Sequence, residues 1–122
     1  MKFHADRPDV QVITGYGAGW LAVDKQAQHS SVLVGSRGLL QPWPCPNFEA
    51  LTAGHLETLV THAPEVVIFG SGARLRFVHP AWLRPLMELR IGFETMDTQA
   101  ACRTYNVLAL EGRNVLAALL LG

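Results

Sequence analysis

A β-type run that passes directly into a helix is the feature that most restricts the fold of this sequence. Residues 91–96 alternate in the two-residue period of a strand. Asp97 follows at an N-cap position, where its carboxylate can accept hydrogen bonds from the free amides of a first helical turn. At about 100° per residue, the next residues form one wide apolar face and a narrow polar stripe, which predicts a helix mostly buried against a sheet. Gly112 should end this helix. The apolar face contains Ala101, Cys102, Tyr105, Leu108 and Ala109, extended by Ala100, Thr104 and Val107, and the polar stripe contains Gln99, Arg103 and Asn106.

The rest of the pattern predicts an α/β fold. Alternating residues in the first third, with glycines at positions 15, 17 and 19, predict an N-terminal β-meander that contains a hairpin. Continuous apolar runs at residues 66–69 and 115–121 are typical of strands covered on both faces. Thr52 is a predicted N-cap of a helix that ends near His62, and a second helix should become regular near Arg84. Strands separated by helices imply α/β, with the meander packed on the sheet or extending it. The expected strands of the meander are residues 10–14, 20–23, 31–34 and 39–43.

Two connecting segments have unusual compositions. Residues 42–46 read Pro-Trp-Pro-Cys-Pro and lack three amide donors, so they should cross the surface as an extended loop with Trp43 exposed. Residues 74–77 alternate arginine with a large apolar residue, which predicts an extended segment exposed on one side.

The C-terminal pattern resembles that of a known protein family. The run E-x-M-D-T-x-A-A-C-R-T-Y-N-V-L at residues 94–108, followed by E-G-R, is the most specific part, and residues 67–72 and Leu75-Arg76-Phe77 extend it upstream. Across roughly residues 10–121, the chain resembles a family of small single-domain proteins of unknown function. The family has archaeal and bacterial members, and its mitochondrial relatives include complex I assembly factor 3. The resemblance implies a three-layer α/β domain around a mixed central sheet, with the last strand antiparallel to its neighbours. It implies no established enzymatic activity.

Size and charge restrict the classes of function. A chain of 122 residues, 49% of them hydrophobic, is expected to form one domain over residues 1–122. Ten basic and ten acidic residues give no net charge, so no global field favours nucleic acid or an anionic membrane, and weak self-association is permitted. The N-terminus, MKFHADRPDV, is too charged for a secretory signal and lacks an import presequence. The longest apolar run is too short to span a bilayer, and two cysteines form a poor disulfide framework, so a cytoplasmic location is expected.

The candidate ligand site lies where a buried strand ends. The turn Gly70-Ser71-Gly72 is either a plain tight turn or a loop whose amides hold an anion with help from Arg74. It lacks the third glycine and the immediate helix of a dinucleotide site. Glu94 is either held in a structural ion pair or is a partly buried acid or base. Arg103 is either solvated or adds charge to the same cleft.

Other reactive side chains do not form a catalytic or metal-binding pattern. Cys102 faces the apolar side of its helix, which predicts a buried and unreactive thiol, and Tyr105 is predicted to be a core aromatic. The histidines lack metal-ligand spacing; His55 and His62 could share a helical face but are more simply a surface pair. The G-x-S-x-G nucleophile motif is absent. We therefore expect no metal and no cofactor, and the absence of a catalytic motif favours a protein that is not an enzyme.

Two functions are compatible with these residues. The first is a non-catalytic binding or assembly module that contacts a protein partner through Arg74, Arg76 and Trp82, because arginine and tryptophan are favoured interface anchors. A few arginines do not make a nucleic-acid module, which usually has a stronger basic excess. The second is a small-molecule-binding protein or enzyme with a cleft near the 70–72 turn and Glu94.

Overall fold

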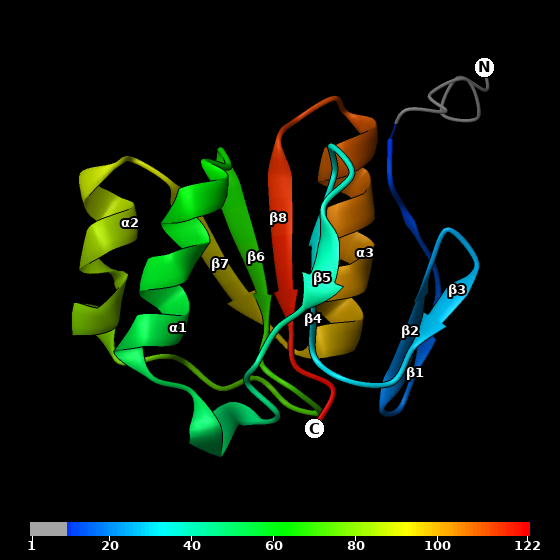
Figure 1. Cartoon of the computed structure of the whole chain (residues 1–122), viewed down its shortest axis with the longest axis horizontal. Coiled ribbons are helices and arrows are strands. Elements are labelled where there is room, and N and C mark those ends of the chain that lie inside the picture. The colour runs from blue at the N-terminus through cyan, green and yellow to red at the C-terminus, as the bar shows by residue number, and fades with distance from the viewer. Residues whose placement is uncertain (1–9) are drawn as a thin grey trace.

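A computed structural model describes residues 10–122 and arranges their strands in two sheets (Figure 1). The central sheet has five strands in the order β5-β4-β8-β6-β7, and the smaller antiparallel sheet has the order β1-β2-β3. The strands are β1 Ile13–Gly17, β2 Trp20–Val23, β3 Gln26–Gln28, β4 Val32–Gly35, β5 Leu40–Pro42, β6 Val66–Gly70, β7 Gly92–Met96 and β8 Val115–Leu119. The helices are α1 Ala53–Glu57, α2 Arg84–Glu88 and α3 Thr98–Leu110, with short 3-10 helices η2 Phe48–Ala50, η3 Thr58–His62 and η4 Pro80–Leu83.

The central sheet is mixed, as the family resemblance implied. β6 is parallel to both β7 and β8, whereas β4 is antiparallel to both β8 and β5. The expectation that the last strand would be antiparallel to its neighbours is therefore correct for β4 and wrong for β6. The reason is that α3 carries the chain back along the sheet between β7 and β8, and such a helical crossover returns the next strand in the same direction.

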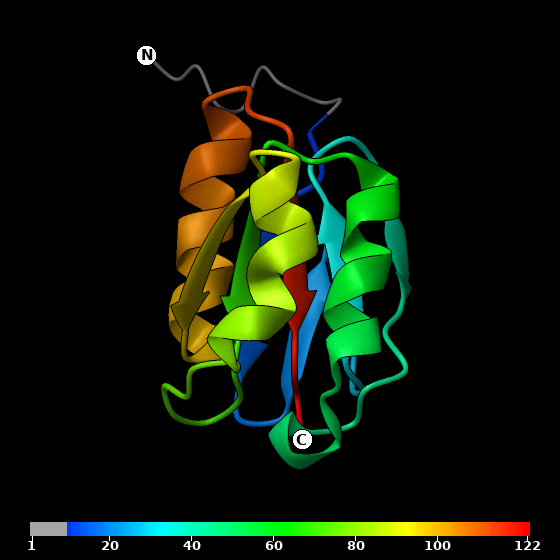
Figure 2. The same cartoon turned by 90° about the vertical axis from the view of Figure 1, so that its left-hand side faces the viewer.

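The fold has three layers with a separate core on each face of the central sheet. Alternate side chains of β6 point to opposite faces, so Ile68 lies in the core under α3 and Phe69 in the core under α1 and α2. Figures 1 and 2 show α1 and α2 on one side of the sheet, and α3 with the small sheet on the other. All five residues of β6 and of β8 are buried, which confirms the prediction from their continuous apolar runs.

Helix ends follow the predicted capping residues. Asp97 accepts a hydrogen bond from Ala100 N at 3.0 Å and begins α3, and Gly112 follows α3 with a φ of +90°. Thr52 caps α1 together with His55, whose Nδ1 accepts from the Thr52 amide at 3.0 Å. The segment after Pro80 forms one 3-10 turn before α2 begins at Arg84, as predicted.

The strands of the predicted meander are divided between the two sheets: β1 and β2 belong to the small sheet, whereas β4 and β5 belong to the central sheet. β1 and β2 form the predicted hairpin. Gly15 and Gly17 lie within β1, whose register with β2 shifts between Ile13 and Gly15, and a Cβ on Gly17 would overlap the Trp20 ring. β3 was not predicted because its sequence is polar. A tight turn at Asp24 and Lys25, with φ of +47° and +74°, joins β2 to β3, and neither residue is the glycine that usually marks such a turn.

Three exposure predictions are wrong. Trp43 is only 4% exposed, because the proline-rich loop turns its ring inward against Phe69, with ring centroids 6.2 Å apart. Residues 71–79 form an irregular loop without the predicted one-sided exposure: Arg74, Leu75 and Phe77 are all exposed, Phe77 to 71%, whereas Arg76 is half-buried over the ring of Phe48. Val107, placed at the margin of the apolar face of α3, is also exposed.

The prediction that the N-terminus has no secretory signal or import presequence rests on residues 1–10. Residues 1–9, which include His4, lie outside the described residues. Within the described range, no helix combines the length and the hydrophobicity needed to cross a bilayer.

Candidate functional site

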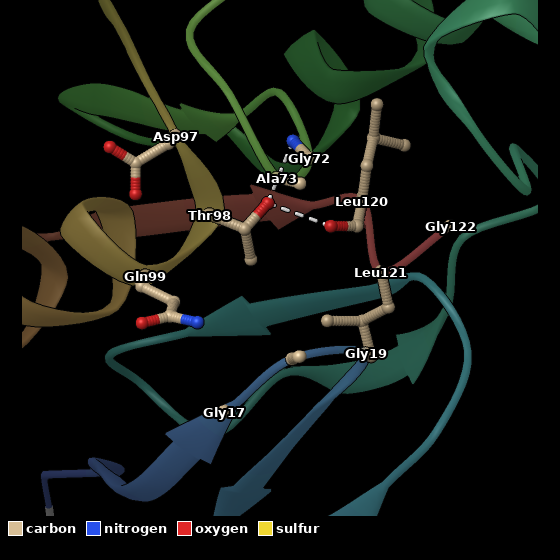
Figure 3. A pocket seen from close by; sticks show the side chains of 11 residues that line it. Gly17, Gly19, Gly72, Ala73, Asp97, Thr98, Gln99, Leu120, Leu121 and Gly122 are labelled. Carbon is tan, nitrogen blue, oxygen red and sulfur yellow. Dashed lines mark hydrogen bonds between the residues drawn. The ribbon is translucent and has the colours of Figure 1, made fainter.

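A cavity of about 360 Å³ lies where the three parallel strands of the central sheet end (Figure 3). Its walls come from four separate segments: the β1–β2 turn, the loop after β6, the first turn of α3, and the residues after β8. The lining residues are Gly17, Ala18, Gly19, Gly72, Ala73, Asp97, Thr98, Gln99, Leu120, Leu121 and Gly122.

The sheet topology explains why a cavity forms there. After β6 the chain crosses the α1 and α2 face to reach β7, and after β7 it crosses the opposite face through α3 to reach β8. One connection therefore leaves the carboxyl end of β6 and the other leaves that of the neighbouring strand β7, and they run over opposite faces of the sheet in opposite directions. Ligand sites of open α/β sheets lie at such a switch point, outside the carboxyl ends of the strands.

Thr98 ties the three strand ends together beside this cavity. Its buried hydroxyl donates to Leu120 O at 2.7 Å and accepts from Gly72 N at 2.9 Å, as the dashed lines in Figure 3 show. Its backbone amide donates to Gly72 O at 2.9 Å. One side chain thus fixes the position of the loop after β6, the start of α3 and the segment after β8.

The glycine turn does not present its amides to the cavity. Ser71 N donates to Met96 O at 2.9 Å, and Gly72 N is taken by Thr98 Oγ1. The geometry therefore gives no support to the predicted amide cradle for an anion. Packing explains why position 70 is a glycine, because a Cβ there would lie 2.9 Å from Thr98 Oγ1 and 3.0 Å from Thr98 Cα.

The cavity wall contains few groups that could react. Asp97 is the one charged side chain among the lining residues, and its Oδ1 is already engaged by Ala100 N. Figure 3 shows the Gln99 amide between Thr98 and the hairpin that carries Gly17 and Gly19. Such a wall can hold a small polar molecule through main-chain and amide groups, but it offers no paired acid and base.

The six predicted site residues do not converge on this cavity. Gly72 lines it, and Gly70 and Ser71 lead to it from β6. Arg74 is exposed farther along the loop. Glu94 is exposed on β7, and Arg103 is exposed on α3, where its guanidinium donates to Tyr16 Oη at 3.0 Å. Neither of these last two is among the lining residues.

The lining residues that the sequence did not indicate as a site are three glycines of the hairpin and the C-terminus, two alanines, two leucines, Asp97, Thr98 and Gln99. They are far apart in the chain and carry no shared chemical motif. The glycine-rich β1–β2 turn was the only local signal, and it was interpreted as a hairpin connection.

The thiol and phenol of α3 are buried, as predicted. Cys102 is fully buried, and burial raises the pKa of its thiol to about 12, which leaves it unreactive at neutral pH. Burial also raises the pKa of Tyr105, whose hydroxyl donates to Gln11 O at 2.6 Å. Cys45, the other cysteine, is also buried and unpaired, and burial raises its pKa as well. Over residues 10–122, no three side chains of the metal-binding types come together.

A second candidate region is the exposed part of residues 74–90, which we call the 74–90 surface. Of the six large apolar side chains found exposed in residues 10–122, four fall in this segment: Leu75, Phe77, Met87 and Leu89. Arg74, Arg84 and Arg90 are exposed among them. The other two predicted anchors are partly engaged: Arg76 donates to Glu49 Oε2 at 2.6 Å, which lowers the pKa of that carboxyl, and the half-buried ring of Trp82 stacks on His79 with centroids 5.8 Å apart.

Comparison with known proteins identifies the family. The profile of a family described as "Protein of unknown function (DUF498/DUF598)" matches residues 13–120. An uncharacterised protein of Rhodobacter capsulatus is 32% identical over 108 residues, covering 88% of this chain and 82% of that protein. A crystal structure of a Bordetella parapertussis protein superposes with a TM-score of 0.85 at 38% identity, covering 91% of this chain and 95% of that one.

A third relative has a functional name. NADH dehydrogenase (ubiquinone) 1 alpha subcomplex assembly factor 3 of Mus musculus is 39% identical over 56 residues, which is 46% of this chain. The matched part spans only 30% of the mouse protein. These relatives, the profile match over almost the whole described range and the shared three-layer fold confirm the resemblance in the C-terminal motif: the chain belongs to the DUF498/DUF598 family of proteins of unknown function.

Proposed function

We propose that this chain is a non-catalytic module that binds another protein during the assembly of a complex. The observation that carries the proposal is the concentration of exposed large apolar side chains in residues 75–89, accompanied by exposed arginines. Exposed apolar surface of this kind is typical of protein interaction sites, and arginine is enriched at their energetic centres. The absence of a paired acid and base around the cavity is compatible with a binding role.

The name of the mouse relative supports assembly as the purpose of this binding. Assembly of a respiratory complex is the finer part of the proposal. It predicts that the captured partner is a subunit or an assembly intermediate of an NADH dehydrogenase. The proposal takes residues 1–122 as one domain and places it in the cytoplasm, which the two unpaired cysteines support.

The test compares two substitutions of exposed apolar residues. Phe77→Ser changes the 74–90 surface, and Val107→Ser is the matched control because Val107 is 58% exposed on α3, outside that surface. Each variant is used as bait in native cell extract, and the bound proteins are quantified by mass spectrometry. Partners retained by wild type and Val107→Ser but lost by Phe77→Ser support the proposal. An identical set of proteins on all three baits contradicts it.

A second candidate function is the binding of a small molecule in the cavity at the strand ends, favoured by its position at the topological switch point. A library of small polar metabolites screened by NMR should then shift the amides of Gly72 and Gln99. Gln99→Ala should weaken the binding, whereas Glu94→Gln, outside the cavity, should leave it unchanged. Equal effects of the two substitutions would exclude this cavity as the site.

A further inference from the structure

The two edges of the central sheet are protected to different extents. At one edge, β5 has only three residues and ends with Pro42, which has no N–H to offer a further strand. At the other edge, β7 has five residues in regular parallel register with β6, and its sequence Gly-Phe-Glu-Thr-Met contains neither proline nor lysine. Natural proteins usually block such an edge by one of these devices. The β7 edge lacks these devices, and its one charged side chain, Glu94, repels an acidic strand but not a basic one.

The pairing with β6 determines which backbone groups of β7 are available. Gly92 N donates to Glu65 O at 3.0 Å, and Met96 O accepts from Ser71 N at 2.9 Å, so residues 92, 94 and 96 face β6. By alternation, Phe93 and Thr95 direct their N–H and C=O groups away from the sheet. No turn, loop or side chain within residues 10–122 is hydrogen-bonded to these four groups.

The side chains of β7 differ on its two faces. On the α2 face, the half-buried ring of Phe93 stacks on Phe69, with centroids 5.8 Å apart. On the α3 face, Glu94 is exposed and forms no salt bridge within the described part of the chain. A strand added here would place one side chain beside an aromatic ring and one beside an unpaired carboxylate. Cross-strand neighbours of opposite charge stabilise a sheet, and so do pairs with an aromatic ring.

We propose that the β7 edge binds an extended segment of another protein by strand addition, with an apolar residue beside Phe93 and a lysine or arginine beside Glu94. Main-chain hydrogen bonds to Phe93 and Thr95 would provide affinity, and the two side-chain neighbours would provide specificity. A second copy of this chain fits less well. If two β7 strands paired antiparallel through the outward groups of Phe93 and Thr95, Phe93 of each copy would lie opposite Thr95 of the other. The two Glu94 carboxylates would then lie opposite each other, and like charges in that position destabilise a sheet. The inference rests on the proposed binding function but uses a different surface from residues 74–90.

The test uses random linear peptides displayed on phage and selected on the full chain. Peptides that alternate apolar residues with a lysine or arginine should be enriched. Thr95→Pro removes an outward N–H without removing a hydrogen bond to β6, so it should weaken these peptides about tenfold or more. Thr95→Ala keeps the N–H and is the matched control, with affinity within about twofold of wild type. Glu94→Lys should weaken binding of the basic peptides, because it replaces an attraction with a repulsion.

Hydrogen exchange of the wild-type protein gives a readout that does not depend on the folding of a variant. The amides of Phe93 and Thr95 should exchange fast in the free protein and slowly with a selected peptide bound, whereas the Glu94 amide should be slow in both states. The inference is overturned by failure to enrich any peptide, by equal binding to Thr95→Pro, or by a wild-type dimer that Thr95→Pro converts to a monomer. Phe77→Ser should leave peptide binding intact, so failure of the 74–90 surface is distinguishable from failure of this edge.

Discussion

Replacement of Thr98 by valine should destabilise the fold strongly although it preserves the shape of the side chain. The hydroxyl of Thr98 donates to Leu120 O and accepts from Gly72 N, and it is almost completely buried. Valine leaves both backbone groups without their partner. A buried donor or acceptor left unsatisfied costs about 1–3 kcal/mol. Both groups adjoin the cavity, from which water can satisfy one of them. We therefore expect a loss of about 2–4 kcal/mol in the free energy of unfolding. For a chain of this size, the melting temperature should fall by roughly 10 °C.

Urea unfolding at 25 °C, followed by circular dichroism, measures this loss. The Gly72 amide should also lose protection against hydrogen exchange, because its acceptor has been removed. Thr104→Val, on the same helix, is the control: Thr104 is half-buried and makes no side-chain hydrogen bond among those found in residues 10–122, so the change should be within about 0.5 kcal/mol. A loss below about 1 kcal/mol for Thr98→Val, or one equal to that of Thr104→Val, would refute the argument that this hydroxyl holds the strand ends together.

Three further predictions concern the same half of the fold. Gly70→Ala should cost about 1–3 kcal/mol in urea unfolding, because the added methyl group would lie 2.9 Å from Thr98 Oγ1; a neutral effect would show that α3 can shift. Asn106→Ala should cost about 1–3 kcal/mol and speed hydrogen exchange of the Ile13 amide, since the Asn106 side chain both accepts from Ile13 N and donates to Ile13 O at 2.8 Å; unchanged exchange would contradict this. Burial raises the pKa of the Cys102 thiol from 9.0 to about 12, so its contribution to stability is complete below pH 9 and is lost as pH rises toward 12. Cys102→Ala should remove up to about 1.4 kcal/mol per pH unit from the alkaline slope of the unfolding free energy, and an identical slope in both proteins would contradict the burial argument.

The regular elements of the second half of the chain were predictable because their signals are local. The buried strands β6 and β8 are continuous apolar runs, and Asp97 and Gly112 mark the two ends of α3 within a few residues of sequence. The polar strand β3 has no such signal: it forms because the tight turn at Asp24 and Lys25 returns it to β2.

Burial in loops and the position of the cavity could not be predicted in this way. Trp43 is buried because the loop packs its ring against Phe69 of β6, which lies 26 residues later in the sequence, and no local pattern reveals this contact. The sequence left open whether Gly70 belongs to a plain tight turn or to a ligand loop, and the structure shows that a glycine is needed there because Thr98 approaches closely. The cavity itself is assembled from four segments, and only the three-dimensional arrangement of the strand ends brings them together.

The position of β8 determines when this protein can complete its fold during synthesis. β8 leaves the ribosome after the other four strands of the central sheet, yet it lies in the middle of that sheet between β4 and β6. Until it emerges, the β4–β5 pair and the β6–β7 pair have no strand to join them, and the apolar faces of both remain uncovered. Its pairing with β4 spans more than half of the chain, a distance that slows folding. The two strand pairs therefore have to avoid association with other chains until residues 115–119 have emerged from the ribosome, and a chaperone that protects them would act before that point.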